Sequence, residues 1–256
     1  MGASAENRVT MSIGSEEELR GMKAAGAIVA RVLAAMKQHV RAGVTTRQLD
    51  EIGARVIRES GAVSAPRMVY HFPGHNCISV NDEAVHGIPG DRVIEPGDLV
   101  KLDVTIEKDG YMADAAVSVA VEPVRQLHHK LARCAERAFQ RALLVARAGA
   151  RVHDIGRAVE NEVRRSGFSV LRGLCGHGIG HKIHEAPEVP NFYEPIARQE
   201  LTEGLVITIE PIIAAGSGES HTAADGWTVK TTDGKPSAHY EHTIVITRGA
   251  PIILTA

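Results

Sequence analysis

The sequence predicts an α/β fold made of two related halves, each with two helices followed by strands. The segments RAGVTTRQLDEIGARVIRESG at 41–61 and RAGARVHDIGRAVENEVRRSG at 147–167 have the same length and lie 106 residues apart. Alternating, β-branched runs follow each helical pair and have the pattern of strands. Such a repeat indicates two similar units packed together, and a site for chemistry is expected between them.

Four helices are expected. Ser15 and Glu18 have the spacing of a capping box ahead of an amphipathic pattern, and Thr45 and Gln48 have the same spacing ahead of a second. Glycines mark where these patterns end. The helices are expected from Ser15 to Gly43, from Thr45 to Gly61, from Leu127 to Ala148 and from about His153 to Arg165.

The predicted strands are 99–106, about 111–121, 206–213 and 240–247. Alternation along the first of them places Asp103 on the face opposite to Leu102 and Val104. If Glu107–Gly110 forms the turn, Asp103 lies directly opposite Asp114, with Cβ atoms about 5 Å apart. Two such carboxylates repel each other unless a dication lies between them. The alternative is an exposed hairpin with two solvated acids.

The chain is expected to form one domain. Its 256 residues are 44% apolar and 23% charged, which is ordinary for a globular protein, and no Pro- or Ser-rich linker divides them. The domain is placed at 13–256, with halves at about 13–122 and 123–256, after a flexible tail at 1–12.

Composition argues against several classes of protein. The net charge of -2 gives no general attraction to nucleic acid or to an anionic membrane. No apolar run approaches the roughly 18 residues of a membrane span, and the first residues lack the apolar core of a signal peptide. The widely spaced Cys77, Cys134 and Cys175 indicate a reducing compartment without a disulfide framework. We therefore expect a cytoplasmic protein.

The most informative residues are five potential metal ligands, each in or beside a short apolar run that has the pattern of a strand. They are Asp103, Asp114, His177, Glu210 and Glu241. Four carboxylates and one imidazole form a hard, oxygen-rich donor set that can hold two divalent ions and a bridging water. Glu210 stands in an otherwise apolar run, where an acid is rarely buried without a partner. These residues point to metal-assisted hydrolysis.

Histidines and glycines gather in GLCGHGIGHKIHEAPEVPNF at 173–192. The glycines allow the backbone to pass close to another group. The histidines could be ligands, general acids or surface residues, and they are His177, His181 and His184. His86, in the turn-rich loop NDEAVHGIPG, is either a solvated loop residue or a proton donor at the mouth of the site.

In order and spacing, six segments resemble the methionine aminopeptidases of the short bacterial type I form. They are CISVNDEAVHGIP, VKLDVTIEKDGYMADAA, CGHGIGHKIHE, ITIEP, GWTVKT and AHYEHTIVIT. The resemblance spans about residues 12–253 and implies the pita-bread (creatinase/aminopeptidase) fold, a pseudo-symmetric antiparallel curved sheet covered by helices. It also implies a dinuclear metal-dependent aminopeptidase that removes the initiator methionine when the second residue is small.

The resemblance implies a role for each site residue. The five potential ligands match those of two divalent ions, which could be Co, Mn, Fe or Zn. Asp114 and Glu241 match the carboxylates that bridge both ions, and Glu210 matches a ligand that also acts as acid and base. His86 and His184 match histidines that contact the substrate amine or the scissile amide and stabilise the tetrahedral intermediate.

The methionine pocket implied by the resemblance is apolar. Its matching residues are Tyr70, His71, Phe72, Cys77 and Trp227, together with His86 and His184. The chain departs from the family pattern in the shortened segment 66–77, where Arg67 stands near a position that is usually small or a cysteine. Ile183 stands where an aromatic often packs. ADAA at 113–116 replaces GDTS, so Asp114 lacks a neighbouring hydroxyl.

The expected partner is the N-terminal peptide of nascent polypeptides, with ribosome association as one option, and the chain is expected to act as a monomer. Two alternative functions are compatible with this fold. An aminopeptidase of the same fold with another preference, such as Xaa-Pro, usually carries an extra N-terminal domain. A non-catalytic binding module on the same scaffold typically loses metal ligands, whereas this chain keeps all five.

Overall fold

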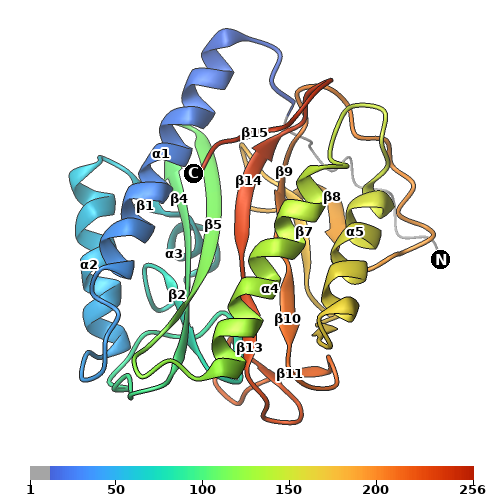
Figure 1. The fold of residues 1–256 in the computed structure, drawn as a ribbon. Helices are drawn as coiled ribbons and strands as arrows, with labels where there is room; N and C mark the ends of the chain where they lie inside the picture. The colour runs from blue at the N-terminus through green and yellow to red at the C-terminus, as the bar shows by residue number, and fades with distance from the viewer. Residues whose placement is uncertain (1–11) are drawn as a thin grey trace, which may run out of the picture.

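The computed structural model describes residues 12–256, in which helices pack against antiparallel sheets (Figure 1). The helices are α1 (Glu16–Lys37), α2 (Thr46–Glu59), α3 (Ala65–Tyr70), α4 (Gln126–Leu143) and α5 (Val152–Arg165). The predicted tail at 1–12 lies outside the described residues except for Ser12, which forms an isolated bridge with Leu205. Between residues 12 and 256, no helix combines the length and apolar character that a membrane span requires.

The central sheet has nine strands and draws on both ends of the chain. Its main path is β1 (Val63–Ser64), β4 (Leu99–Lys108), β5 (Tyr111–Ala120), β14 (Glu241–Val245), β9 (Val206–Ile209), β7 (Cys175–Gly178) and β8 (Glu185–Pro190). Two further strands join it at the side of this path, β2 (Cys77–Val80) on β4 and β15 (Ile252–Ile253) on β14. Every pairing described in this sheet is antiparallel.

Two small sheets of three strands each complete the fold. The first is β13 (Ser237–His239), β10 (Ile212–Ala214) and β6 (Ser169–Val170). The second is β11 (Ser220–Thr222), β12 (Val229–Thr231) and β3 (Glu83–Val85). The second sheet connects the two halves, because β3 precedes residue 122 and β11 and β12 follow it.

The sequence repeat is also present in the structure. Helices α2 and α5 begin and end 106 residues apart, and so do the short strands β1 and β6. Gly43 and Gly149 both have φ of 87°, a left-handed conformation that glycine adopts without a Cβ clash. The capping box predicted at Thr45 and Gln48 is confirmed in both directions.

The first helix of each pair ends before the predicted residue. Helix α1 stops at Lys37 and α4 at Leu143, rather than at Gly43 and Ala148. The backbone N–H of Gly43 donates to the carbonyl of Ile94 at 2.9 Å, and that of Gly149 donates to Leu201 at 2.9 Å. These tertiary hydrogen bonds satisfy groups that a longer helix would have used internally.

Apolar residues on alternate positions of the sheet form one core cluster under each helical pair. Leu102, Val104 and Ile106 of β4 pack with α1 and α2 in the first cluster. Ile207 and Ile244 pack with α4 and α5 in the second. Since strand side chains alternate between faces, the polar residues between these positions point to the other face, away from the helices.

The hairpin of β4 and β5 differs in register from the prediction. The turn is Asp109-Gly110, both with positive φ (52° and 87°), as a two-residue type I′ turn requires. Thr105 therefore lies opposite Asp114, and Asp103 lies opposite Ala116. The prediction that Asp103 directly faces Asp114 was wrong by two residues. A shift of two leaves both carboxylates on the same face.

The predicted strand 206–213 is interrupted at Glu210-Pro211 and forms β9 and β10. The predicted strand 240–247 corresponds to β14, which begins at Glu241, and Tyr240 separates it from β13. Pro211 has no N–H to donate to a ladder, and its carbonyl instead accepts a bond from Tyr240 N at 3.3 Å. At both places the chain passes between the central sheet and a small sheet, next to the predicted ligands.

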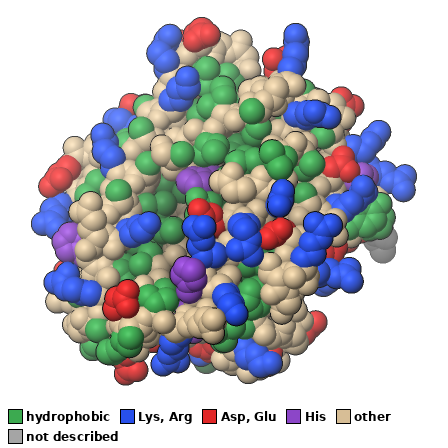
Figure 2. Space-filling view, viewed as in Figure 1, with side chains coloured by type: hydrophobic (Ala, Val, Ile, Leu, Met, Phe, Trp, Pro, Cys, Tyr) green, Lys and Arg blue, Asp and Glu red, His purple; other side chains and the backbone are tan. Residues whose placement is uncertain are grey.

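Figure 2 shows the face of the molecule that carries the helices. Lys and Arg side chains are spread over this face and lie among Asp and Glu side chains. This distribution agrees with the small net charge of the chain, -2.

Candidate metal centre

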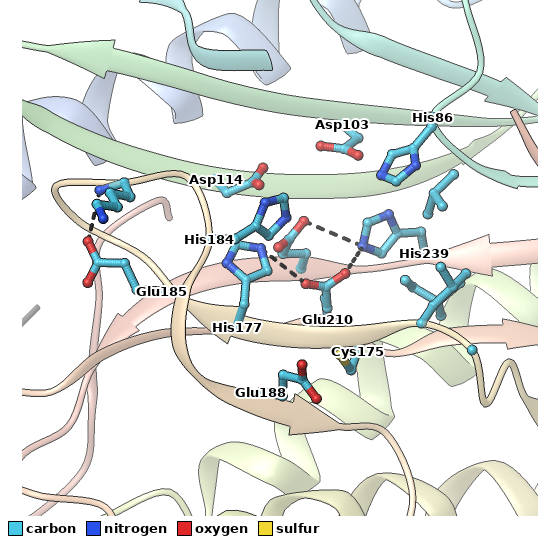
Figure 3. A pocket seen from close by; sticks show the side chains of 16 residues that line it. His86, Asp103, Asp114, Cys175, His177, His184, Glu185, Glu188, Glu210 and His239 are labelled. Carbon is cyan, nitrogen blue, oxygen red and sulfur yellow. Dashed lines mark hydrogen bonds and ion pairs between the residues drawn. The ribbon is translucent and has the colours of Figure 1, made fainter. Parts of the chain in front are cut away.

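Five neighbouring strands of the central sheet each bring one predicted ligand to the same cavity. In the order β4, β5, β14, β9 and β7 these are Asp103, Asp114, Glu241, Glu210 and His177, with Glu210 directly after the end of β9. All five line a cavity of about 550 Å³ (Figure 3). The sequence-predicted ligands are therefore together, in a row across the sheet.

The junction of the two halves runs through the middle of this row. Asp114 lies on β5 of the first half, and Glu241 lies on β14 of the second half, which pairs with β5. The backbone N–H of Asp114 donates to Thr243 Oγ1 at 2.9 Å, and that hydroxyl donates to Asp114 O at 2.8 Å. A side chain of β14 thus replaces a ladder bond at this junction.

Burial makes these carboxyl groups weaker acids than usual, because it raises their pKa values. It raises the pKa of Asp103 to about 7 and that of Glu210 to about 8. The pKa values of Asp114 and Glu241 rise well above their ordinary range, because both are buried and have carboxylate neighbours. Thr105, across from Asp114, partly opposes the rise at that residue and supplies the hydroxyl that ADAA lacks.

The donor set fits divalent cations. Asp114 Oδ1 and Glu241 Oε1 are buried and have no hydrogen-bond partner, and such oxygens are costly to leave unpaired. One donor atom each of Asp114, His177 and Glu241 lie within 4.8 Å of one another, and so do those of Glu210, His239 and Glu241. Cations among these oxygens would relieve the mutual repulsion of four carboxylates.

The neighbours of His177 hold its ring with Nε2 toward Glu210. Its Nδ1 lies 2.9 Å from the carbonyl oxygen of Gly178, which can only accept, so the proton is on Nδ1. The lone pair of Nε2 then faces Glu210 Oε1 at 3.6 Å. Thr208 Oγ1 accepts a bond from His177 N at 3.0 Å and donates to Glu210 Oε1 at 3.0 Å. Thr208 therefore holds two of the five ligands in place.

The predicted close backbone approach in the glycine-rich segment occurs at Gly176 and Gly178. A Cβ on Gly176 would lie 2.6 Å from the carbonyl oxygen of Thr208, and one on Gly178 would collide with the carbonyl of Ala186. Only glycine lets β7 pass this close to its neighbours.

Two further histidines stand at the same cavity. His86 and His184 both line it and keep part of their rings accessible to solvent. Tyr70 OH lies 2.6 Å from His184 Nδ1. When the phenol donates this bond, the His184 proton is on Nε2, where it can be donated to a bound molecule.

A smaller cavity of about 280 Å³ adjoins the first and shares four of its residues. The predicted pocket residues that line it are Tyr70, Phe72, Cys77 and Trp227, with His86 and His184. Phe72 and Trp227 contact edge to face at 5.3 Å between centroids. Its volume lies at the lower end for ligand pockets, suited to a single side chain.

Three other residues that the sequence places near this pocket differ in whether they line it. His71 is exposed, has a left-handed backbone and does not line the cavity, because the chain turns there at the end of α3. Arg67 points away, with Nη1 3.3 Å from His75 Nε2. Ile183 does line the cavity and is buried in an apolar cluster.

Sequence reasoning missed His239 and left Thr208 without a role. His239 ends β13 and is 2% exposed, and its Nε2 lies 3.4 Å from Glu241 Oε2 and 3.7 Å from Glu210 Oε2. Burial lowers its pKa to about 3. One signal was available: it precedes Glu241 by two residues, the spacing that puts two strand side chains on one face.

A cavity rich in carboxylates and imidazoles has the donor set of a metal-dependent hydrolase. The chain belongs to metallopeptidase family M24, whose sequence profile matches residues 20–248. It is 46% identical to methionine aminopeptidase 2 of Bacillus subtilis, over 96% of this chain and 99% of that protein.

Solved structures confirm the fold. A methionine aminopeptidase from Thermotoga maritima superposes with a TM-score of 0.92 at 32% identity, over 96% of this chain and 99% of that one. A prolidase from Pyrococcus furiosus shares the fold with a TM-score of 0.77 at 21% identity, over 97% of this chain and 66% of that one. The predicted pita-bread fold and the predicted resemblance to methionine aminopeptidases are both confirmed.

Proposed function

We propose that this protein is a metal-dependent aminopeptidase that removes the initiator methionine from polypeptides whose second residue is small. The observation that carries this proposal is the convergence of five ligand residues from five neighbouring strands on a cavity that adjoins a one-side-chain pocket. The high identity to a named methionine aminopeptidase over nearly the whole of both chains supports the same activity.

Two divalent ions of the Mn, Fe, Co or Zn type would be held by Asp103, Asp114, His177, Glu210 and Glu241. The central position of Asp114 and Glu241, on paired strands at the junction of the halves, supports them as the shared ligands. When bound, such ions lower the pKa of water and make hydroxide available near neutral pH.

Each side chain at the site has its own role in the reaction. The α-amine of the substrate, in its neutral form, would be taken up at the metal centre that these five residues hold, which would favour cleavage at the N-terminus. Glu210 accepts the proton of the attacking water and passes it to the leaving amine. His184, oriented by Tyr70, donates a hydrogen bond to the developing oxyanion from Nε2. His86, which lines both cavities, contacts the substrate amine or the scissile amide.

The pocket around Phe72 and Trp227 would hold the methionine side chain. Tyr70, Cys77 and Ile183 complete its apolar wall, and a thioether packs well against aromatic edges. Because Arg67 points toward His75, its charge does not enter this pocket. The substrate itself is the N-terminus of a nascent polypeptide, and the protein acts on it as a monomer, with or without the ribosome.

A substrate panel tests the proposal. Metal-free protein is reconstituted with Mn, Fe, Co or Zn in turn and is offered Met-Ala-Ser, Met-Lys-Ser and Ala-Pro peptides. We expect methionine release from Met-Ala-Ser and little from Met-Lys-Ser, which carries a large second residue. Preferential cleavage of Ala-Pro would support the alternative Xaa-Pro specificity. No release from any peptide with any metal would support a binding module.

A further inference from the structure

His239 is a sixth ligand-capable side chain in the cavity, outside the five that the sequence pattern assigns. It ends β13, only 2% of its surface is exposed, and it lines the cavity with the predicted ligands. In Figure 3 its ring points toward Glu210 from the side opposite His177. None of the roles described above uses this imidazole.

The ring nitrogens of His239 have two carboxylates nearby but make no hydrogen bond in the part of the chain that the structure describes. Neither Nδ1 nor Nε2 makes a hydrogen bond within residues 12–256, although both are buried. By contrast, Nδ1 of His177 is bound to the carbonyl of Gly178. A buried polar group without a hydrogen bond is unfavourable, so the His239 ring is available to a partner that the protein itself does not supply.

The distances around His239 fit a shared cation better than a hydrogen bond. Its Nε2 lies 3.4 Å from Glu241 Oε2 and 3.7 Å from Glu210 Oε2, whereas N–H···O hydrogen bonds are typically about 2.7–3.2 Å. Donor atoms bound at about 2.0–2.2 Å to a tetrahedral ion lie about 3.3–3.6 Å apart. His177 Nε2 lies 3.6 Å from Glu210 Oε1, which is also a distance expected for two donor atoms on one ion.

The carboxylates are arranged symmetrically between the two imidazoles. Glu210 directs Oε1 toward His177 and Oε2 toward His239. Glu241 belongs to both groups of close donors, one with Asp114 and His177 and the other with Glu210 and His239. Each group therefore contains one imidazole and shares the Glu241 carboxylate.

We propose that His239 is a metal ligand, which binds one of the two ions together with Glu210 and Glu241, so that each ion has its own imidazole. The proposal rests on metal binding at this cavity, as the proposed function requires, and adds a ligand to it. The added imidazole nitrogen makes the donor set of the ion bound by His239 softer. This ion site should therefore prefer Zn, Co and Fe over Mn.

X-ray absorption spectroscopy of the Zn- or Co-loaded protein tests this directly, because outer-shell scattering counts the imidazoles per ion. With two ions bound, we expect about one imidazole per ion in the wild type. His239→Gln and His177→Gln should each lower the average to about one half. His181→Gln, at an exposed ring that binds Gly110 O, is the matched control and should leave the count unchanged.

Metal affinity gives a second readout. Isothermal titration should show His239→Gln weakening one of the two sites at least about tenfold, while the other keeps its affinity. A wild-type average of one half imidazole per ion would overturn the assignment of His239 and leave the proposed function standing. A wild type that binds no ion would overturn both. The wild-type count decides the matter even if a variant fails to fold.

Discussion

At the scale of single residues, Glu210 is the most constrained group in the site. It lies between two imidazoles, accepts a hydrogen bond from Thr208 Oγ1 at 3.0 Å and is 8% exposed. Its position follows from Pro211, which ends β9 and turns the chain toward the small sheet. A carboxylate held this firmly is suited to proton transfer in a fixed direction.

Replacing the Glu210 carboxylate with an amide should remove that proton transfer. We expect Glu210→Gln to lower kcat on Met-Ala-Ser by about 10²–10⁴, with an unchanged circular dichroism spectrum. Metal content measured on the same sample separates lost proton transfer from lost metal. Glu203→Gln, at an exposed ion pair with Arg248, is the control. Near-normal turnover in Glu210→Gln would reject the shuttle role.

Tyr70 should matter through His184. Tyr70→Phe removes the hydroxyl 2.6 Å from His184 Nδ1 and keeps the ring that lines the side-chain pocket. A lost hydrogen bond of this type is worth about 0.5–1.5 kcal/mol, so we expect kcat to fall up to about tenfold with little change in KM. Tyr193→Phe, at an exposed ring, serves as control. An unchanged kcat in Tyr70→Phe would show that His184 needs no such support.

At the scale of secondary structure elements, the site depends on how β5 meets β14. Only Glu241 with Ala116 and His242 with Ala115 pair in the ladder, and beyond them Thr243 binds both backbone groups of Asp114. This contact sets the distance between Asp114 and Glu241, the two ligands closest to the junction of the halves.

Thr243→Val tests the importance of this contact. Valine has a similar shape but leaves the N–H and C=O of Asp114 unpaired, and each unpaired buried group costs about 1–3 kcal/mol. We expect the free energy of unfolding, from urea titration of the metal-free protein, to fall by about 2–6 kcal/mol. Thr222→Val, on the exposed edge strand β11, should change it by less than about 0.5 kcal/mol. Equal effects would contradict the role of Thr243.

Sequence patterns could predict the elements and their faces but not all of their pairing. Alternation predicts that the side chains of Asp103 and Leu102 point to opposite faces of the sheet. This prediction does not depend on how the strands are paired. The register itself depends on the turn, and Asp109-Gly110 is the two-residue hairpin signal, which fixes Thr105 rather than Asp103 opposite Asp114. The carboxylates remained near each other because the error was an even number of residues.

Some site residues could not be predicted because their role depends on tertiary contacts. The two-residue spacing of His239 from Glu241 was a usable signal, but the break between β13 and β14 at Tyr240 follows from no local pattern. His71 was placed in the pocket by its position beside Tyr70. The left-handed turn at φ 57° that ends α3 directs it outward instead.

At the scale of the whole molecule, the two halves have separate cores and a shared site. Each helical pair covers its own apolar cluster, while the central sheet and the carboxylate row run across both. We propose that residues 13–256 act as one catalytic domain for this reason: neither half carries a complete set of ligands. The repeat visible in the sequence thus explains why the site lies at the junction.

The carboxylate row should make the metal-free protein less stable as the pH rises. Asp103 and Glu210 have pKa values near 7 and 8 in the fold, against about 4 in an unfolded chain. The folded state therefore binds more protons, and the stability that they provide is complete below about pH 4 and is lost as the pH rises through 7 to 8.

Differential scanning fluorimetry checks this prediction. With a chelator present, we expect Tm to fall between pH 6 and pH 9. Saturating Zn or Mn should raise Tm and remove most of the fall, because a cation stabilises the ionised carboxylates and binds only the folded state. Asp103→Asn should flatten the metal-free profile. A metal-free Tm that rises with pH over this range would contradict the raised pKa values of Asp103 and Glu210.

We propose that the five predicted ligands at the junction of the halves hold the metal ions on which methionine removal depends. The most direct test follows methionine release from Met-Ala-Ser while metal is titrated into metal-free wild type and into Asp114→Asn. We predict no release without metal, recovery over the first two equivalents in the wild type, and a rate at least about 10²-fold lower in the variant at every metal concentration. Release by the metal-free protein, or full recovery in Asp114→Asn, would contradict the account.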